Sequence, residues 1–520
     1  MWIFAGTITW ILYLLVCIAG YTLFYLTENV QVASFSQLLY TLQVSMGGAE
    51  NTIWQIVGGF FEKMWLQVLL ATLLYIGFMT VALRRRKMVR KNMPVSSLLK
   101  NGVTVLGCSC IFSSLVLCGV LGAKIHSGYD LLGIGEYLDE RSTVSNLYEE
   151  QYVPISESGL KAPQKKKNLI WIMIESMEST YADRSHGGTM DENLIPNLTG
   201  IALENQDFSA DGSDQINGGK VTNGSSWTVA GMVSQTSGTP LSLGNGAFTH
   251  DFEKDNSFMP NLESIGDLLE EQGYDQQLMV GSEASYGGRR NYFSQHGDYY
   301  IYDLQTAKYE NKIPQNYREW WGFEDRKLFS YAKESMLERA ASGQPFNFMM
   351  LTADTHFKNG YLCEDCEDHF DEQMENVIHC SDHRVKEFID WILEQDFADD
   401  TVIVLSGDHL NMDGLIPELV DEDYTRSVYF SVINGPEIKV DQDREYTTLD
   451  ICPTVLEALG FDIPNGRIGL GTSLYSGFPT LTEELGFDEF NAQIAYQSNY
   501  YNNHLLAGDD TGPAESSESE

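Results

Sequence analysis

The chain has 520 residues, 43% of them hydrophobic and 20% charged, so it is long enough to bury a large core in more than one region. Lys and Arg number 33 against 73 Asp and Glu, and the resulting net charge of −40 excludes a nucleic-acid-binding footprint. Residues 1–122 carry eight basic and three acidic side chains, a net of +5, which leaves −45 for residues 123–520. This division predicts a membrane region followed by a water-soluble domain.

Three apolar segments lie in the first region: Trp2–Leu26, Trp65–Leu83 and Val103–Leu121. The first has no Asp, Glu, Lys or Arg and is long enough to cross a hydrocarbon core of ~30 Å. A signal peptide is the alternative, but this segment lacks a basic N-terminal region and a small-residue cleavage site, and two further apolar segments follow it. We therefore expect residues 1–122 to hold about three transmembrane helices.

The side of the membrane is predicted from a basic segment between the second and third spans. Residues 84–91 contain four Arg and two Lys, and short loops of this kind stay in the cytoplasm. Three spans then place the N-terminus inside and everything after about residue 123 outside. Residues 28–64 become an external loop close to the membrane surface.

The eight cysteines divide between the two regions. Four fall in the apolar segments, where a small apolar side chain needs no special role. Cys363, Cys366 and Cys380 cluster in the external domain, with Cys452 farther along. A zinc site would need a second ligand pair, so a disulfide in an oxidising compartment is favoured; the sequence leaves its pairing open.

The rest of the chain alternates between short apolar runs and helical patterns. We expect a linker at 123–166, a catalytic domain at 167–480 and a C-terminal extension at 481–520, whose acidic residues 509–520 should be disordered. The runs predict an α/β domain with helices on both faces of a mostly parallel sheet. The predicted strands are 168–174, 277–280, 346–352, 401–405 and 428–433, and the clearest predicted helices are Met259–Gln272, Asp325–Ala341 and His379–Glu394.

Two of the predicted strands are followed directly by residues of the types that bind metal ions. The run 168–174 ends at Glu175, and 401–405 leads through Ser406 and Gly407 into Asp408 and His409. In a doubly wound sheet, ligands bind beyond the carboxyl ends of the strands, so residues far apart in sequence converge there. A carboxylate directly after an apolar strand is costly without a partner, which favours a hard-cation site.

Thr228 is the candidate nucleophile. It follows a segment rich in Gly and Ser, Asn223–Trp227, and begins a helix-compatible run, so its hydroxyl is expected at a helix N-terminus that suits a phosphate. A threonine hydroxyl is a poor nucleophile unless a base or a metal activates it. Taken alone, Thr228 would more simply be an N-cap residue.

Four motifs together resemble a known family. Ile174-Glu175-Ser176, the segment 224–233 (Gly-Ser-Ser-Trp-Thr-Val-Ala-Gly-Met-Val), Asp354-Thr355-His356 and Ser406-Gly407-Asp408-His409 are similar to the phosphoglycerol transferase branch of the alkaline phosphatase and sulfatase superfamily. That branch includes the periplasmic glucan phosphoglycerol transferases, which the Trp-Thr segment resembles most, and the lipoteichoic acid synthases. The resemblance covers roughly residues 165–475. It implies a sulfatase-like α/β/α sandwich with a mostly parallel sheet, preceded here by the α-helical transmembrane region.

The resemblance also implies roles for individual residues. Glu175, Asp408 and His409 match the metal ligands, and Thr228 matches the nucleophile that also touches the metal. His356 matches the histidine near the transferred phosphate, where it can bind an oxygen or protonate a leaving group. Arg289 resembles a substrate-binding arginine; because Gly287 replaces the tryptophan that the lipoteichoic acid synthases have two residues earlier, Arg290 is the alternative.

The implied reaction transfers sn-glycerol-1-phosphate from phosphatidylglycerol to an envelope glycan or a polyglycerolphosphate chain, through a glycerophosphoryl-threonine. The ligands suit Mn²⁺ or Mg²⁺, with Zn²⁺ possible, and the resemblance favours Mn²⁺. The expected location is a bacterial-type cell membrane, with a multi-pass anchor and an extracytoplasmic catalytic domain. Sulfatase activity is disfavoured, since no Cys/Ser-x-Pro-x-Arg segment is present and Cys452-Pro453-Thr454 lies in the wrong place.

Two other functions remain open from the sequence. A phosphoethanolamine transferase would use the same threonine and metal with a different lipid headgroup. A non-catalytic, membrane-tethered binding protein with a relict site would be indifferent to Thr228→Ala.

Overall fold

The computed structural model describes residues 2–25, 35–44, 50–243, 252, 258–413, 415–421, 423–439 and 443–508. The predicted disordered tail, 509–520, lies outside them. The chain forms two compact units: one comprises Met1–Phe35 and Ala49–Tyr137, and the other Ser36–Gly48 and Leu138–Glu520. We call the first the membrane unit and the second the catalytic unit.

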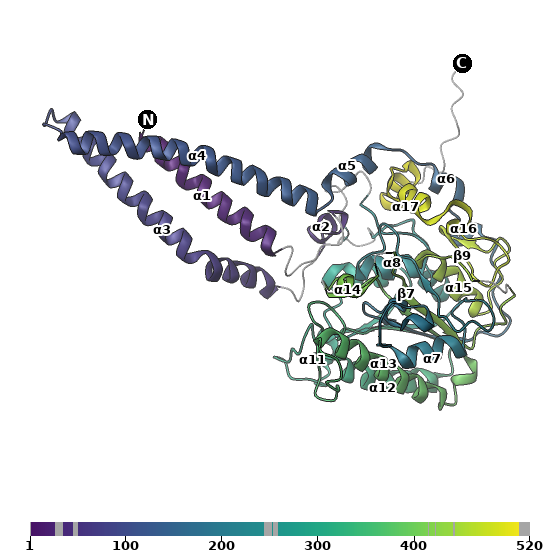
Figure 1. Ribbon diagram of the computed structural model, residues 1–520. Helices are drawn as coiled ribbons and strands as arrows, with labels where there is room; N and C mark the ends of the chain where they lie inside the picture. The colour runs from purple at the N-terminus through teal and green to yellow at the C-terminus, as the bar shows by residue number, and fades with distance from the viewer. Residues whose placement is uncertain are drawn as a thin grey trace, which may run out of the picture. The chain divides into compact units, whose positions relative to one another are not determined.

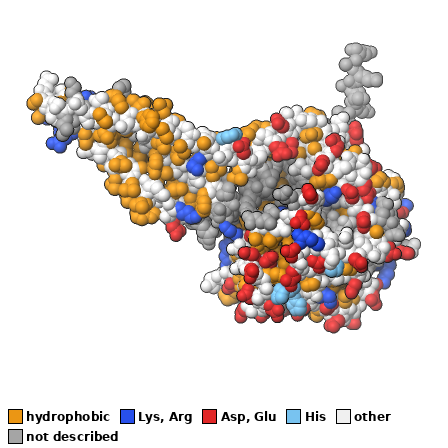
Figure 2. Space-filling model, in the orientation of Figure 1, with side chains coloured by type: hydrophobic (Ala, Val, Ile, Leu, Met, Phe, Trp, Pro, Cys, Tyr) orange, Lys and Arg blue, Asp and Glu red, His pale blue; other side chains and the backbone are white. Residues whose placement is uncertain are grey.

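The membrane unit contains three long helices: α1 (Trp2–Tyr25), α3 (Glu50–Arg90) and α4 (Ser97–Leu131). All three are long and apolar enough to cross a membrane, with candidate spans at Trp2–Tyr25, Val57–Arg90 and Asn101–Leu131. Their outward faces are apolar, as the hydrophobic side chains over these helices show (Figure 2). The three predicted spans are therefore confirmed as helices of suitable length and composition.

Two details of the sequence prediction are wrong in this unit. The basic segment 84–91 is not a loop: up to Arg90 it forms the last turns of α3. Part of the predicted external loop 28–64 is helical, because α3 begins at Glu50. Lys and Arg at a helix C-terminus are stabilised by the helix dipole, so the same charges that predicted a loop also suit a helix end.

The catalytic unit is built on a seven-stranded sheet in the order β2-β7-β6-β1-β5-β3-β4. The central strands from β6 to β4 are parallel; at one edge β7 pairs antiparallel with β6, and β2 pairs antiparallel with β7. The strands of this sheet are β1 (Asn168–Ile174), β2 (Gly218–Gly219), β3 (Asp275–Val280), β4 (Tyr300–Tyr302), β5 (Phe346–Leu351), β6 (Thr401–Gly407) and β7 (Val428–Ile433). A separate two-stranded sheet pairs β8 (Arg467–Ile468) with β9 (Gly471–Thr472). All five predicted strands are confirmed.

Helices cover both faces of the sheet, as predicted (Figure 1). One face packs on α7, α12 and α13 through a continuous apolar core, and α8 and α15 lie on the other. Besides the three long helices of the membrane unit, these five included, the α-helices are α2 (Phe35–Thr41), α5 (Ile134–Ser142), α6 (Leu147–Gln151), α7 (Pro196–Glu204), α8 (Thr228–Ser237), α9 (Ile265–Glu271), α10 (Arg289–Gln295), α11 (Leu304–Tyr309), α12 (Asp325–Ser342), α13 (Gln373–Leu393), α14 (Leu415–Leu419), α15 (Ile451–Ala458), α16 (Leu481–Leu485) and α17 (Phe487–Ala495).

The boundaries of two predicted helices change for local reasons. The helix predicted from Met259 begins only at Ile265, because Ser264 and Asp267 form a capping box there. The helix predicted from His379 begins earlier, at Gln373. The C-terminal residues 481–495 form α16 and α17, and a short π-helix, Tyr500–Leu506, follows them.

Candidate active site

The site lies where β1 and β6 end. These strands are parallel neighbours in register, with Ile174 opposite Gly407, so the next residues, Glu175 and Asp408, emerge side by side. Ser176 joins them: its backbone N–H donates to Asp408 Oδ1 at 2.8 Å and its hydroxyl donates to Glu175 Oε1 at 2.7 Å. Ser176 has a φ of 54°, an uncommon value outside glycine that fits a residue held at a functional turn.

His409 faces both carboxylates. Its Nε2 lies 3.5 Å from Glu175 Oε1 and 3.4 Å from Asp408 Oδ2. Its Nδ1 lies 2.8 Å from the carbonyl oxygen of Leu410. Because a carbonyl only accepts, Nδ1 carries the hydrogen, so the neutral form of the ring has its lone pair at Nε2, as in a metal-binding histidine.

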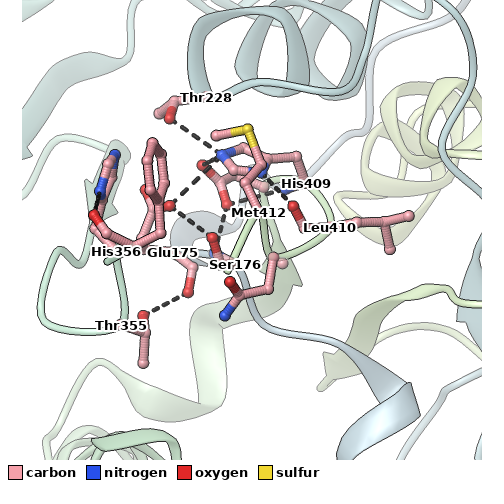
Figure 3. A network of polar contacts seen from close by, with 12 residues as sticks. Glu175, Ser176, Thr228, Thr355, His356, His409, Leu410 and Met412 are labelled. Carbon is pink, nitrogen blue, oxygen red and sulfur yellow. Dashed lines mark hydrogen bonds and ion pairs between the residues drawn. The ribbon is translucent and has the colours of Figure 1, made fainter. Parts of the chain in front are cut away.

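Thr228 completes the group from the opposite side (Figure 3). Its Oγ1 lies 3.2 Å from His409 Nε2. Thr228 is the first residue of α8 and Trp227 is the N-cap, so the simpler interpretation of Thr228 as the cap is wrong. Thr228 is half-buried, whereas Glu175, Asp408 and His409 are 0–2% exposed. The hydroxyl therefore lies on the accessible side of the cluster.

Gly231, one turn into α8, allows this approach. A Cβ at that position would lie 2.0 Å from the carbonyl oxygen of Asp408, so a larger residue would push the helix away from the end of β6. Gln235, one turn farther on, donates from Nε2 to the carbonyl oxygen of Gly407 at 2.8 Å. The spacing of Thr228, Gly231 and Gln235 on one helix face thus fixes the distance between the hydroxyl and His409.

The cluster fits a divalent cation. Ligand atoms of Glu175, Asp408 and His409 all lie within 4.8 Å of one another. Asp408 Oδ2 is buried without a hydrogen-bond partner among the described residues, a costly state that a cation would relieve. Burial and then the Glu175 carboxylate raise the pKa of Asp408 to about 7. Burial alone would lower the pKa of His409, but the Asp408 and Glu175 carboxylates raise it above its usual value.

His356 lies beside this group, on the loop after β5 (Figure 3). Its Nδ1 lies 2.6 Å from the carbonyl oxygen of Phe357, so the neutral ring again presents its lone pair at Nε2. Burial lowers the pKa of His356 to about 4, which keeps the ring neutral near pH 7. The preceding Thr355 hydroxyl donates to the carbonyl oxygen of Glu175 and ties this loop to the cluster.

Two buried carboxyl groups support the His356 loop. Asp325 accepts from the backbone N–H groups of Ala353 and Asp354, at 2.8 and 2.9 Å, and Asp354 Oδ1 accepts from the N–H of Asp325 at 3.2 Å. Burial and the proximity of the two carboxyl groups raise the pKa of Asp354. Asp354 therefore anchors the loop rather than facing the cluster.

Of the two candidate arginines, Arg289 is the one close enough to the cluster for the Glu175 and Asp408 carboxylates to act on its charge. It is 6% exposed. Its Nε donates to Tyr286 O at 3.1 Å and its Nη2 to Ser282 Oγ at 3.0 Å. Arg290 instead pairs with Asp303 at 2.7 Å. The geometry favours Arg289 as the cationic group near the substrate.

Sequence analysis missed the aromatic residues around His356. The ring centroid of Trp321 lies 4.8 Å from that of His356, and Tyr286 lies 6.0 Å from Trp321. Trp320 has a φ of 56°, and its indole N–H donates to the carbonyl oxygen of Ala353 at 3.0 Å. The pair Trp320-Trp321 in a segment without hydrophobic periodicity was the signal available in the sequence.

The cysteines of the catalytic unit play no part in this site. Cys366 and Cys380 form a disulfide, which removes two of the three thiolates that this cluster could offer to a zinc ion. Cys452 is fully buried in α15, and burial raises the pKa of its thiol. It is a core residue, in agreement with the rejection of Cys452-Pro453-Thr454 as a sulfatase nucleophile segment.

Comparison with known proteins identifies the family of the chain. The family model described as Sulfatase matches residues 167–461. Phosphoglycerol transferase I of Xanthomonas axonopodis pv. citri (strain 306) is 30% identical over 303 residues, 57% of this chain and 41% of the relative. Phosphoglycerol transferase I of Salmonella paratyphi B is 30% identical over 324 residues, 61% of this chain and 40% of the relative.

Among solved structures, the lipoteichoic acid synthase LtaP of Listeria monocytogenes is 17% identical with a TM-score of 0.46, over 67% of this chain and 97% of that one. The chain spans about two fifths of the length of the curated relatives it matches. The family model, in contrast, covers more than half of this chain and includes every residue of the cluster. With its mostly parallel sheet and strand-end cluster, the chain belongs to the sulfatase family, on an alkaline phosphatase-like fold.

Proposed function

We propose that the protein is a membrane-anchored, divalent-cation-dependent phosphoglycerol transferase. It moves sn-glycerol-1-phosphate from phosphatidylglycerol to a hydroxyl of an envelope glycan or a polyglycerolphosphate chain. The observation that carries the proposal is the 3.2 Å separation between Thr228 Oγ1 and His409 Nε2, beside two buried carboxylates at adjacent strand ends. The 30% identity to proteins named phosphoglycerol transferase I supports this choice of reaction.

Glu175, Asp408 and His409 would hold the cation, with the half-buried Thr228 as the fourth ligand. When bound, Mn²⁺ or a similar ion lowers the pKa of a nearby hydroxyl and neutralises charge on a phosphoryl group. Oxygen and imidazole donors without a thiolate suit Mn²⁺ or Mg²⁺, and also accept Zn²⁺. The unsatisfied Asp408 Oδ2 supports an ion at this point.

In the first step, Thr228 Oγ1 attacks the phosphorus of phosphatidylglycerol. The bond from phosphorus to the diacylglycerol oxygen breaks, and the proton lost by Thr228 balances the proton gained by diacylglycerol. Glycerophosphoryl-Thr228 remains. The free N–H groups at the start of α8 and the Arg289 guanidinium, whose Nη1 has no hydrogen-bond partner among the described residues, are suited to the phosphoryl oxygens.

In the second step, an acceptor hydroxyl attacks the same phosphorus and Thr228 leaves. His356 is neutral near pH 7 with its lone pair at Nε2, so it is suited to accept the proton of the attacking hydroxyl. The family resemblance implied a histidine that binds a phosphate oxygen or protonates a leaving group. The lowered pKa of His356 favours the base role instead, with the acid role available after it has taken that proton.

The membrane helices would anchor the catalytic unit to the membrane that contains its lipid donor. Three candidate spans precede the catalytic unit, and the basic end of α3 favours a cytoplasmic position for residues 84–91. The catalytic unit is then extracytoplasmic on a multi-pass anchor. The Cys366–Cys380 disulfide supports an oxidising compartment for this unit.

The test uses the full-length protein in detergent micelles that contain phosphatidylglycerol and Mn²⁺, without an acceptor. We expect release of diacylglycerol and a glycerophosphate-sized gain in the intact mass of the protein. Thr228→Ala should lower diacylglycerol release by at least about 10⁴-fold and abolish the mass gain, because no other group replaces the nucleophile. Thr228→Ser keeps a hydroxyl and serves as the matched control, with partial activity.

Each result points to one function. Loading from phosphatidylethanolamine, with a phosphoethanolamine-sized mass, would make the protein a phosphoethanolamine transferase on the same site. A wild-type protein that binds Mn²⁺, stays folded and loads from neither lipid would overturn the enzymatic proposal and leave the membrane-tethered binding protein.

A further inference from the structure

A short segment between the first two membrane helices belongs to the catalytic unit. Residues 36–48 group with Leu138–Glu520, although α1 precedes them and α3 follows. The segment contains most of α2, whose Leu39 and Tyr40 are 7% and 1% exposed, and Val44 after it is 8% exposed. A seven-residue helix with buried apolar side chains depends on the surface against which it packs.

Tyr40 packs against the residue that precedes the nucleophile. Its ring centroid lies 5.8 Å from that of Trp227 and 5.2 Å from that of Phe252. Trp227 is the N-cap residue of α8, so its position sets where Thr228 begins the helix. The Tyr40 ring therefore supports the backbone from which the Thr228 hydroxyl projects.

The Tyr40 hydroxyl reaches the segment that carries Arg289. It donates to the carbonyl oxygen of Gly287 at 2.9 Å. Gly287 and Gly288 have φ values of 69° and 81°, a left-handed pair that turns the chain into α10, where Arg289 is the first residue. A Cβ on Gly288 would lie 3.0 Å from the Tyr40 hydroxyl and 3.7 Å from Val44 Cγ1, so the segment fits closely against this turn.

The same segment approaches the chain that follows the cation ligands. Gln37 Nε2 lies 4.0 Å from Met412 Sδ, and Met412 is three residues beyond His409. Met412 and His409 lie together in the site (Figure 3). Residues 36–44 thus contact all three chain segments that present Thr228, Arg289 and His409.

We infer that the loop between the first and second membrane helices is a working part of the active site, and that Tyr40 is a positioning residue for Thr228 and Arg289. The inference rests on the proposed function for its catalytic consequence. Tyr40 touches no reacting atom: its ring fixes Trp227 and its hydroxyl fixes Gly287. A catalytic unit expressed without residues 36–44 would lack this support.

The inference also bears on the membrane topology. A segment that packs on the catalytic unit lies on the same side of the membrane as that unit. The segment follows the first span and the catalytic unit follows the third, and two crossings between them return the chain to the same side. The contacts of Tyr40 and the three-span arrangement are therefore mutually consistent.

The test measures the first step in full-length variants, as the rate of diacylglycerol release against the concentration of phosphatidylglycerol. Tyr40→Phe keeps the ring and loses the hydrogen bond to Gly287, so we expect the half-saturating lipid concentration to rise about fivefold with little change in the maximal rate. Tyr40→Ala also releases Trp227, and the maximal rate should fall on the order of 100-fold. Tyr309→Ala, at a tyrosine 85% exposed, is the matched control and should change neither value.

Hydrogen exchange separates this inference from the proposed function. In Tyr40→Ala, the amides of residues 225–231 and 285–291 should exchange faster than in the wild type, whether or not the protein transfers glycerophosphate. A purely structural role would lower the melting temperature of Tyr40→Phe and leave its half-saturating concentration unchanged. Unchanged exchange in both segments, or wild-type kinetics for folded Tyr40→Ala, would overturn the inference.

Discussion

Two clusters in the catalytic unit satisfy the same simple criterion for a metal site, and only one fits a metal. Glu175, Asp408 and His409 place their ligand atoms within 4.8 Å of one another, and so do Cys363, Cys366 and Cys380. In the first, which we call the strand-end cluster, a buried carboxylate oxygen has no hydrogen-bond partner among the described residues. In the second, the cysteine cluster, a disulfide joins Cys366 to Cys380.

The difference shows that a group of potential ligand atoms lying close together is not enough to make a metal site. The strand-end cluster concentrates negative charge in a buried position, and a cation compensates that cost. The cysteine cluster already has its covalent bond, and the remaining thiol, Cys363, accepts a hydrogen bond from Arg384 Nη2 at 2.7 Å. The first cluster is therefore suited to a cation, whereas the second already has its covalent bond and its hydrogen bond.

The largest effect should come from removing a ligand of the strand-end cluster. Asp408→Asn keeps the size of the side chain and removes the charge that holds the cation. A Lewis acid stabilises the transition state of phosphoryl transfer by several kcal/mol, so the rate of diacylglycerol release should fall on the order of 10³-fold. Mn²⁺ should no longer raise the melting temperature. Asp413→Asn, a buried aspartate outside the cluster, is the control; equal losses in both variants would argue against a cation at Asp408.

A smaller effect should appear in the pH dependence of cation binding. The pKa of Asp408 is raised to about 7 in the metal-free protein, so below that pH the cation must displace a proton. Apparent Mn²⁺ affinity should fall as the pH decreases from 8 to 5.5, approaching tenfold per pH unit.

The stability of the metal-free protein should change with pH in the opposite direction to the cation affinity. The unfolded chain loses the Asp408 proton near pH 4 and the folded protein only near 7, so this group makes the metal-free protein less stable as the pH rises between these values. The rise in melting temperature on adding Mn²⁺ should therefore be greater at pH 8 than at pH 6, measured by thermal denaturation. A rise of the same size at both pH values would contradict the assignment. His356, with a pKa of about 4, should not limit activity in this range.

The smallest effect on activity should come from the cysteine cluster. Cys363 Sγ lies 3.1 Å from Cys366 Sγ, so removing Cys380 alone would leave a thiol able to replace it. The double variant Cys366→Ser/Cys380→Ser removes the cross-link cleanly. Its closed loop has a sequence separation of 14, so we expect a loss of about 3 kcal/mol in the free energy of unfolding.

Transfer activity per folded molecule should be unchanged in this variant, since it keeps every residue of the strand-end cluster. Cys363→Ser, which retains the disulfide, is the control for stability. Denaturant unfolding monitored by fluorescence gives both free energies. A loss of Mn²⁺ binding in the double variant would mean that the two clusters are coupled.

The sequence by itself determined the features that depend only on neighbouring residues in the chain. Apolar length marked the three membrane helices, and apolar runs of five to seven residues marked β1 and β6 together with the candidate ligands Glu175, Asp408 and His409 that follow them. Parallel strands bring their carboxyl ends to one edge, so a position beyond a strand is informative before the sheet order is known. The helix at Thr228 was also predictable, because Gly and Ser before a helical run favour an N-terminus.

Only the tertiary structure decided which of these elements meet. The register of β1 on β6 places Glu175 beside Asp408. Gly231 allows α8 to approach closely enough for Thr228 to contact His409. The packing of the surrounding chain pairs Cys366 with Cys380. Tyr40 is the clearest case: its neighbours Trp227 and Gly287 lie 187 and 247 residues away along the chain. A local pattern specifies period and length, whereas contacts between distant segments depend on how complete side-chain volumes pack, and no single segment contains that information.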